Sequence, residues 1–313
     1  MRTYLFFFII FLSISCAKNP EEQASEAIDR ALTHLSSGEC DEAIEVLEEA
    51  DDQDDNPIYL QVLASAYACK ADYEEIAVIS DDLSGLDTST PASIMSSLTT
   101  MTHSPETAAD SADYVNLKRA INILLNSTSG SPGHEARVSK FGQRKAGDMS
   151  VQALLLNVVN LGKFLNYYGN VNASGVKGGG SNTNACFLNY TDARAQGIAT
   201  GPTAGACNAI NDGHPDLDQS TDDGKRRLCE GLMLITNTLD ILDNLDLGGS
   251  DELSVLEDVS TQVNTFKTAA VAAGLSTLIN MTSQSACVTA LNTPATLDDM
   301  EYLYALVFET GLQ

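Results

Sequence analysis

Tryptophan is absent from this sequence of 313 residues, and aromatic residues make up only 6% of it. Aromatic rings are the usual platform on which proteins stack sugars, so their scarcity argues against a carbohydrate-binding surface. Positive charge is scarce too: 17 lysines and arginines stand against 43 acidic residues, a formal net charge of −26. Such a surface repels phosphate backbones, so we expect no nucleic-acid partner.

The common catalytic and nucleotide-binding motifs are also missing. The four histidines are widely separated, and the sequence contains no HExxH, no GxSxG, no phosphate-binding GxxxxGKS/T and no GxGxxG that follows a strand. Carboxylate pairs are too frequent in so acidic a chain for one pair to be singled out. We therefore expect a protein that is not an enzyme and that carries no cofactor.

Hydrophobic runs long enough to span a membrane are lacking as well. The run from Leu5 to Leu12 follows the cationic Arg2 and contains four phenylalanines. It is too short to cross the ~30 Å of hydrocarbon in a bilayer. A charged start, an apolar middle and small residues before a cleavage site are typical of a secretory signal peptide. We assign residues 1–15 to such a peptide.

Residues 12–16 read Leu-Ser-Ile-Ser-Cys, which places Cys16 directly after small residues. This segment resembles the lipobox of bacterial lipoproteins, in which the peptide is cut before the cysteine and the cysteine carries several acyl chains. The resemblance implies a lipid on Cys16 that anchors the protein to a membrane, followed by a tether over residues 16–23. The alternative is an ordinary signal peptide with a free Cys16. Ala17 in place of an aspartate implies the outer membrane of the cell envelope, facing the periplasm.

Six cysteines remain, and no two of them form a CxxC pair. An even number in an exported chain indicates disulfides, although six cysteines allow fifteen connectivities. The missing CxxC pair leaves little support for a thioredoxin-like or zinc-ribbon site. The six are Cys40, Cys69, Cys186, Cys207, Cys229 and Cys287.

Every clear periodic segment has its apolar residues at helical spacing, and the serine- and threonine-rich stretches lack the sustained alternation of strands. We therefore predict an all-α fold. Residues 38–50 read GECDEAIEVLEEA, Asn56-Pro57 follow, and the Gly-Glu-Cys position recurs as Ala-Asp-Tyr 33 residues later. These features resemble a tetratricopeptide repeat, whose period is ~34 residues.

The resemblance covers residues 24–86, as one good repeat and one degraded repeat in which Ile76 stands where alanine is usual. The alternative is an unrelated array of antiparallel helical hairpins. The repeat register implies a Cys40–Cys69 disulfide, because antiparallel packing brings those helix ends together. It also implies a concave groove for a protein partner, lined by non-core positions of the 57–70 helix and its end: Tyr59, Gln61, Ser65, Lys70 and Glu74.

Residues 87–106 are rich in serine and threonine with two prolines, which indicates a linker. A second helical domain is expected over residues 107–313, centred on the apolar helix at 149–168. Arg137, Lys140, Arg144 and Lys145 form the one dense basic cluster. Pairing with the chain's own carboxylates, or solvation, is the ordinary interpretation of that cluster, and an anionic partner or a lipid head group is the alternative.

Residues 169–224 form a long segment rich in Gly, Asn, Asp and Thr. So long a loop is unusual unless it is stapled or functional, which suggests a Cys186–Cys207 bridge and leaves Cys229 for Cys287. Its carboxylates suggest a calcium site, although no glutamate stands at the twelfth position of an EF-hand loop. A solvated acidic loop is the alternative to a site made of Asp212, Asp216, Asp218 and Asp222.

Two functions follow from these patterns. The first is a lipid-anchored scaffold or adaptor that binds envelope proteins through its helical repeats. The second is a lipoprotein that binds a small ligand or calcium through the loop at 186–224.

Overall fold

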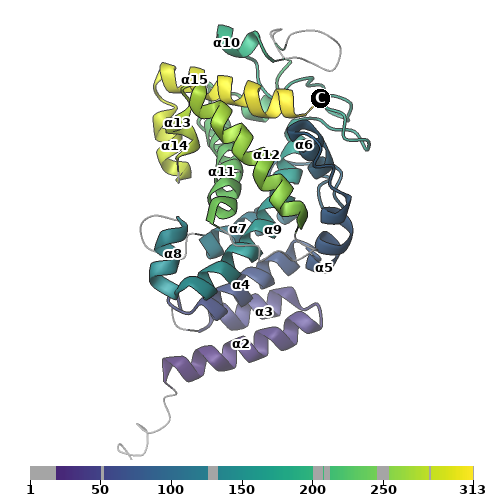
Figure 1. Ribbon diagram of the computed structural model, residues 1–313. Helices are drawn as coiled ribbons and strands as arrows, with labels where there is room; N and C mark the ends of the chain where they lie inside the picture. Colours follow the sequence, from purple (N-terminus) through teal and green to yellow (C-terminus); the bar gives the residue numbers. More distant parts are fainter. Residues whose placement is uncertain are drawn as a thin grey trace, which may run out of the picture.

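The computed structural model describes residues 19–50, 53–125, 133–199, 207, 212–244, 254–281 and 283–312. The predicted signal peptide and the lipidation site at Cys16 lie outside these residues. The described chain is helical and contains no strand, so the predicted all-α class is confirmed (Figure 1).

The described residues form the following elements, in chain order. They are α2 (Pro20–Ser36), α3 (Cys40–Glu48), α4 (Pro57–Lys70), α5 (Glu75–Ala77), the π-helix η1 (Val78–Asp82), the 3-10 turn η2 (Leu83–Gly85), α6 (Pro91–Thr99), α7 (Ala112–Leu125), α8 (His134–Phe141), α9 (Gln143–Tyr168), α10 (Ala193–Gln196), η3 (Pro215–Leu217), α11 (Asp222–Asn244), α12 (Ser254–Ala272), α13 (Ser276–Ile279), α14 (Gln284–Ala290), α15 (Pro294–Tyr304) and the π-helix η5 (Ala305–Glu309).

Proline marks the first turn of α2, α4, α6 and α15. Its fixed φ suits that position, where its missing N–H would have no helical partner. Asn56 caps α4 by accepting hydrogen bonds from the backbone N–H groups of Ile58 and Tyr59 at 3.1 and 3.2 Å. A preceding Asn or Thr caps α2 and α6 in the same way. Local sequence therefore sets where these helices begin.

Helices α2, α3 and α4 stack as antiparallel hairpins at one end of the molecule (Figure 1). Ala31, Ala43 and Ala64 are fully buried between them, and their small side chains let the helices approach closely. The predicted Cys40–Cys69 disulfide is present, with the two Cα atoms 5.6 Å apart. The hairpins thus have the pairing that the repeat register implied, while their membership of the tetratricopeptide class stays a prediction.

The segment expected as a linker, residues 87–106, instead contains the packed helix α6. Ile94, Met95 and Leu98 of α6 are buried, and the helix lies against α9. Buried apolar side chains also continue without a break from the hairpins into the remaining helices, since α4 packs on α7 and α9. The described residues therefore share one core across the boundary that the sequence suggested.

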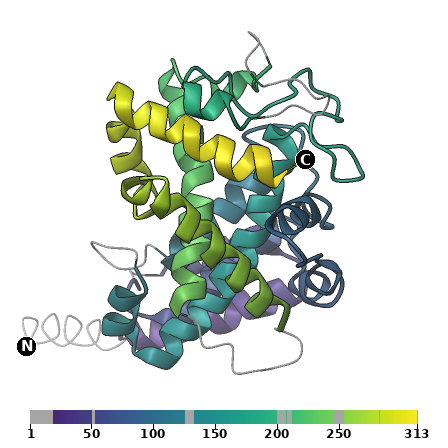
Figure 2. The same cartoon turned by 45° about the horizontal axis from the view of Figure 1, so that its top comes forward.

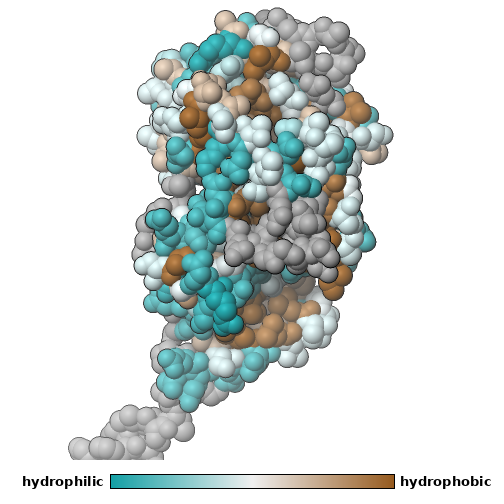
Figure 3. Space-filling model, viewed as in Figure 1, coloured by the Kyte–Doolittle hydropathy of each residue, from teal (hydrophilic) through white to brown (hydrophobic). Residues whose placement is uncertain are grey.

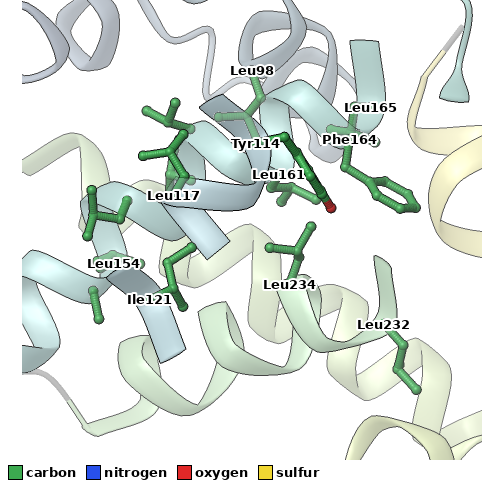
Figure 4. Close-up of a cluster of buried hydrophobic side chains, with 14 of the residues drawn as sticks. Leu98, Tyr114, Leu117, Ile121, Leu154, Leu161, Phe164, Leu165, Leu232 and Leu234 are labelled. Atoms are coloured by element: carbon green, nitrogen blue, oxygen red, sulfur yellow. The ribbon is translucent and has the colours of Figure 1, made fainter. Parts of the chain in front are cut away.

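Helix α9 is the centre of this core, as its apolar sequence predicts. Leu154, Leu161, Phe164 and Leu165 of α9 lie with Tyr114 and Leu117 of α7 and Leu234 of α11 in Figure 4. Helix α15 crosses one end of α11 (Figure 2). Helix α12 runs obliquely along the side of α11.

The other two predicted disulfides are also present. Cys186 and Cys207, both within the long loop, are bonded to each other with Cα atoms 5.9 Å apart. Cys229 of α11 is bonded to Cys287 of α14 with a Cα separation of 5.8 Å. The long loop is packed rather than solvated near the Cys186–Cys207 bridge, since Phe187, Leu188 and Tyr190 are buried. The bridge ties two parts of the loop together, and the three buried side chains pack the loop on the helical core.

Candidate functional site

The groove predicted on α4 is covered by the chain itself. The Gln152 side-chain amide of α9 donates hydrogen bonds to the backbone oxygen of Gln61 at 3.2 Å and to Ser65 Oγ at 3.0 Å. Tyr59, expected outside the core, is buried, and its hydroxyl donates to the backbone oxygen of Leu47 at 2.6 Å. Tyr59 is therefore a core residue rather than a groove position, and α9 contacts Gln61 and Ser65 on the face predicted to be open.

The remaining two predicted groove residues are at the surface. Lys70 is exposed and forms an ion pair with Asp41 of α3. Glu74 is exposed, and its backbone N–H donates to the His103 ring at 3.4 Å. These two residues lie at the end of α4 and in the turn after it, away from the face that α9 covers.

The four aspartates proposed for calcium serve separate local roles. Asp216 accepts a hydrogen bond from the Tyr167 hydroxyl at 2.9 Å, and Asp218 accepts from the backbone and hydroxyl of Ser220. The Asp212 backbone oxygen accepts two N–H groups near Cys186, while Asp222 stands in the first turn of α11.

Within the described residues, the one group of three candidate metal ligands that converge within 4.8 Å is Cys186, Cys207 and Glu309. Its two sulfurs are already bonded to each other. The predicted assembly of the four aspartates into a calcium site is therefore wrong.

The basic cluster is used inside the protein. Arg137 is fully buried, 3.5 Å from an Asp240 oxygen, and Lys140 lies 3.0 Å from Asp55. Gly142, with φ of 81°, separates α8 from α9, so the four basic residues do not share one continuous helix. The ordinary interpretation, pairing with the chain's own carboxylates, holds for Arg137 and Lys140.

The best-formed candidate binding site is a cavity of about 320 Å³ under α12, hereafter the apolar cavity. Four helices and the C-terminal segment around η5 surround it, and that segment lies beside α6 in Figure 1. None of its lining residues is charged. They are Leu86, Thr90, Pro91, Ala92, Ile94, Met95, Leu98, Val158, Leu161, Ile235, Thr238, Val259, Gln262, Val263, Phe266, Leu306, Val307, Thr310 and Gly311.

Helix α12 supplies the outer wall because its sequence carries a single apolar stripe. Val259, Val263 and Phe266 recur at spacings of four and three, which places them on one face of a helix. Val259 is buried, but Val263 and Phe266 are only partly buried, although they face the interior. The stripe therefore covers the cavity without filling it.

Three of the four polar side chains in the lining are already occupied. The Thr238 hydroxyl donates to the backbone oxygen of Leu234 and accepts from Asn157, and the Thr310 hydroxyl donates to the backbone oxygen of Leu306. Thr90 caps α6. Gln262 is the exception: its amide makes no hydrogen bond with the described residues, so it can serve a bound molecule.

A second buried polar site lies on η5, on the other side from the cavity. Glu309 is fully buried with Lys177 Nζ 2.5 Å away, and it accepts hydrogen bonds from the Phe187 N–H at 2.6 Å and the Tyr190 hydroxyl at 2.9 Å. Burial raises the pKa of Glu309, while the Lys177 ammonium opposes that rise. These contacts fasten the disulfide-closed loop to η5.

Sequence reasoning did not find the apolar cavity. Its lining comes from residues 86–311, so no local motif marks it. Two signals were available: the incomplete apolar stripe of α12, and α6, which contains no charged residue.

No helix in the described part of the chain has the length and hydrophobicity needed to cross a membrane. Comparison with known proteins found no matching family, no matching curated protein and no matching solved structure. The geometry of the apolar cavity is therefore the main indicator of function.

Proposed function

We propose that the protein binds an apolar small molecule in the apolar cavity while a lipid on Cys16 holds it in the bacterial envelope. The observation that carries this proposal is an uncharged cavity of about 320 Å³ with a half-buried outer wall. Ligand sites of proteins are mostly apolar hollows of roughly 300–1,000 Å³ with a few polar groups. The cavity has that size and composition. An apolar molecule in this cavity would gain van der Waals contacts along the lining and would remove apolar surface from water.

Binding rather than catalysis is proposed because the lining carries no acid, base or nucleophile with a partner that would activate it. The location is proposed from the amino terminus: a signal peptide over residues 1–15, a lipidated Cys16 and an outer-membrane position facing the periplasm. The acidic surface, with its net charge of −26, gives no support for nucleic acid as a partner.

A matched pair of substitutions on α12 tests the cavity. Val263→Phe adds volume on the face that lines the cavity, whereas Val271→Phe makes the same change at an exposed position outside it. Binding of the neutral fluorescent probe N-phenylnaphthylamine is followed by its emission. We expect Val263→Phe to abolish the signal and Val271→Phe to retain it, with equal circular dichroism for both. Equal probe binding by the two variants would contradict the proposal.

We also propose that the helical hairpins at the amino-terminal end are tetratricopeptide-like and act as a scaffold for a protein partner. This role is favoured by apolar side chains at the surface of that end: Leu32 and Ile58 are 48% and 52% exposed. Hydrophobic residues also gather next to α2 in Figure 3. Lys70 and Glu74 are the groove candidates that stay accessible.

Charge reversal at Lys70 and Glu74 tests this second role. Capture of envelope proteins by the double variant is compared with capture by wild type, and Val271→Phe serves as a surface control. Reduced capture by the charge-reversed protein alone would support the scaffold, while identical capture would remove these two residues from it.

A further inference from the structure

We propose that the ligand is an uncharged amphiphile with one hydrocarbon chain, and that the Gln262 side chain binds its polar group. The inference rests on the proposed function, because it specifies the molecule that the apolar cavity takes. It excludes free fatty acids and two-chain lipids as the preferred ligands. Four observations lead to it: cavity size, the uncharged lining, the charges near its edge and the unoccupied amide.

The volume of the apolar cavity limits the number and length of the hydrocarbon chains that a ligand can place in it. A cavity of about 150 Å³ with a similar lining holds one benzene ring, that is, six carbons. The apolar cavity, at about 320 Å³, is therefore large enough for roughly a dozen carbons. One medium-length chain fits this volume, whereas two chains of a phospholipid exceed it.

The lining excludes a charged head group. A carboxylate that leaves water must be paired or hydrogen-bonded, and no lysine, arginine or histidine is among the lining residues. The nearest cation on the covering helix is Lys267, which is already paired with Asp243 of α11. An anion in the cavity would therefore lose its hydration without gaining a counter-charge.

Acidic residues near the edge of the apolar cavity also disfavour an anionic ligand. Asp258 precedes the lining residue Val259 on α12 and accepts a hydrogen bond from Thr88 at 3.2 Å. Asp87 is exposed between the lining residues Leu86 and Thr90, and hydrogen bonds from Ser89 lower the pKa of its carboxyl. The lowered pKa keeps the Asp87 carboxyl ionised at neutral pH, so its charge repels an approaching anion.

Gln262 supplies the recognition. It lies one helical turn from Val259 and Phe266, on the lining face of α12, and its amide is unoccupied within the described structure. A primary amide both donates and accepts hydrogen bonds. It can therefore serve a hydroxyl, which does both, or an ester, which only accepts.

The test compares ligands that carry different head groups on a hydrocarbon chain of the same length. Dodecanol, methyl dodecanoate and dodecanoic acid compete with N-phenylnaphthylamine for the full-length protein at about pH 8, where the acid is ionised. We expect the alcohol and the ester to displace the probe at concentrations at least tenfold lower than the acid. Equal or better displacement by the acid would overturn the inference while leaving the cavity as a ligand site. A failure of all three compounds and of the probe to bind would overturn the proposed function itself.

Variants at Gln262 test its role separately. Gln262→Leu removes the amide with little change in volume, and we expect the alcohol and ester to bind roughly 2- to 12-fold more weakly, the factor for one net hydrogen bond. Probe affinity should stay unchanged. Gln262→Glu, which offers an ionised acceptor, should lose the ester and keep more of the alcohol.

A matched control is Gln143→Leu, at an exposed glutamine that does not line the cavity. Unchanged head-group preference in both Gln262 variants would remove this residue from recognition. The same loss in Gln143→Leu as in Gln262→Leu would show an indirect effect and would likewise contradict the assignment.

Discussion

Gln152 of α9 and Ser65 of α4 are 87 residues apart in sequence, yet the Gln152 amide donates a hydrogen bond to Ser65 Oγ at 3.0 Å. The same amide reaches the backbone oxygen of Gln61. This contact ties the amino-terminal hairpins to the central helix of the core. It also explains why the concave face of the hairpins is closed to a partner there.

Replacing Gln152 should loosen that connection. Gln152→Ala removes two hydrogen bonds at a partly buried interface, and we expect a loss of about 1–2 kcal/mol in the free energy of unfolding. Urea denaturation monitored by circular dichroism measures it. Gln143→Ala, at an exposed position of the same helix, serves as the control and should change stability by less than about 0.5 kcal/mol. Equal stability of the two variants would mean that the contact contributes nothing net.

His214 should make stability depend on pH. The ring is buried against Tyr167 and Tyr168, with centroids 4.7 and 5.0 Å apart, and its Nδ1 accepts the Asp216 N–H. Burial lowers the pKa of His214 from its ordinary value. Below about pH 6.5 the unfolded chain therefore binds a proton that the folded protein does not. Stability should fall as the pH drops through that range, by at most about 1.4 kcal/mol per pH unit from this group.

His214→Asn isolates this contribution, since it keeps an acceptor for the Asp216 N–H but does not titrate. The variant should be less stable at neutral pH, because it loses the ring contacts. Its stability should nevertheless decline less steeply than that of wild type between about pH 7 and pH 5. Parallel curves from chemical denaturation at several pH values would show that His214 does not titrate as expected.

Apolar residues at helical spacing were sufficient to predict the all-α class and most of the long helices. The resemblance to a tetratricopeptide repeat implied a hairpin register that brings Cys40 beside Cys69, and this bridge is present. Serine and threonine over residues 87–106 concealed α6, although Pro91 at a helix start and the buried Ile94 and Leu98 one turn apart are helix signals. There the burial of an apolar face outweighed weak helix propensity.

The functional sites depend on tertiary contacts that local patterns do not contain. Asp218 looked like a metal ligand, but Ser220 uses its carboxylate within the same turn. The groove on α4 was inferred from one helix pair, whereas Gln152 covers it from far along the chain. The apolar cavity exists only where α6, α9, α11, α12 and η5 meet, so its members share no short segment.

The Cys40–Cys69 bridge should contribute strongly to stability. Its cysteines are 29 residues apart, and closing a loop of that length restricts the unfolded chain by about 3–4 kcal/mol in the chain-entropy model. Replacing both cysteines with serine should lower the free energy of unfolding by roughly that amount. Comparison with the reduced wild-type protein is confounded by the other two bridges, so the double variant is measured in its oxidised form. A loss below about 1 kcal/mol would contradict the expected role of the bridge.

The anchor proposed at Cys16 can be tested independently of ligand binding. Cys16→Ala removes the thiol that a lipid would occupy and leaves every described residue unchanged. In cells, we expect the variant to leave the membrane fraction and to lose incorporation of labelled palmitate, since several acyl chains account for firm attachment.

Purified without its first 16 residues, the protein should still bind N-phenylnaphthylamine, because the apolar cavity is formed by residues 86–311. Unchanged palmitate labelling of Cys16→Ala would contradict the lipoprotein assignment. Release from the membrane together with loss of probe binding would show instead that the amino terminus contributes to the cavity.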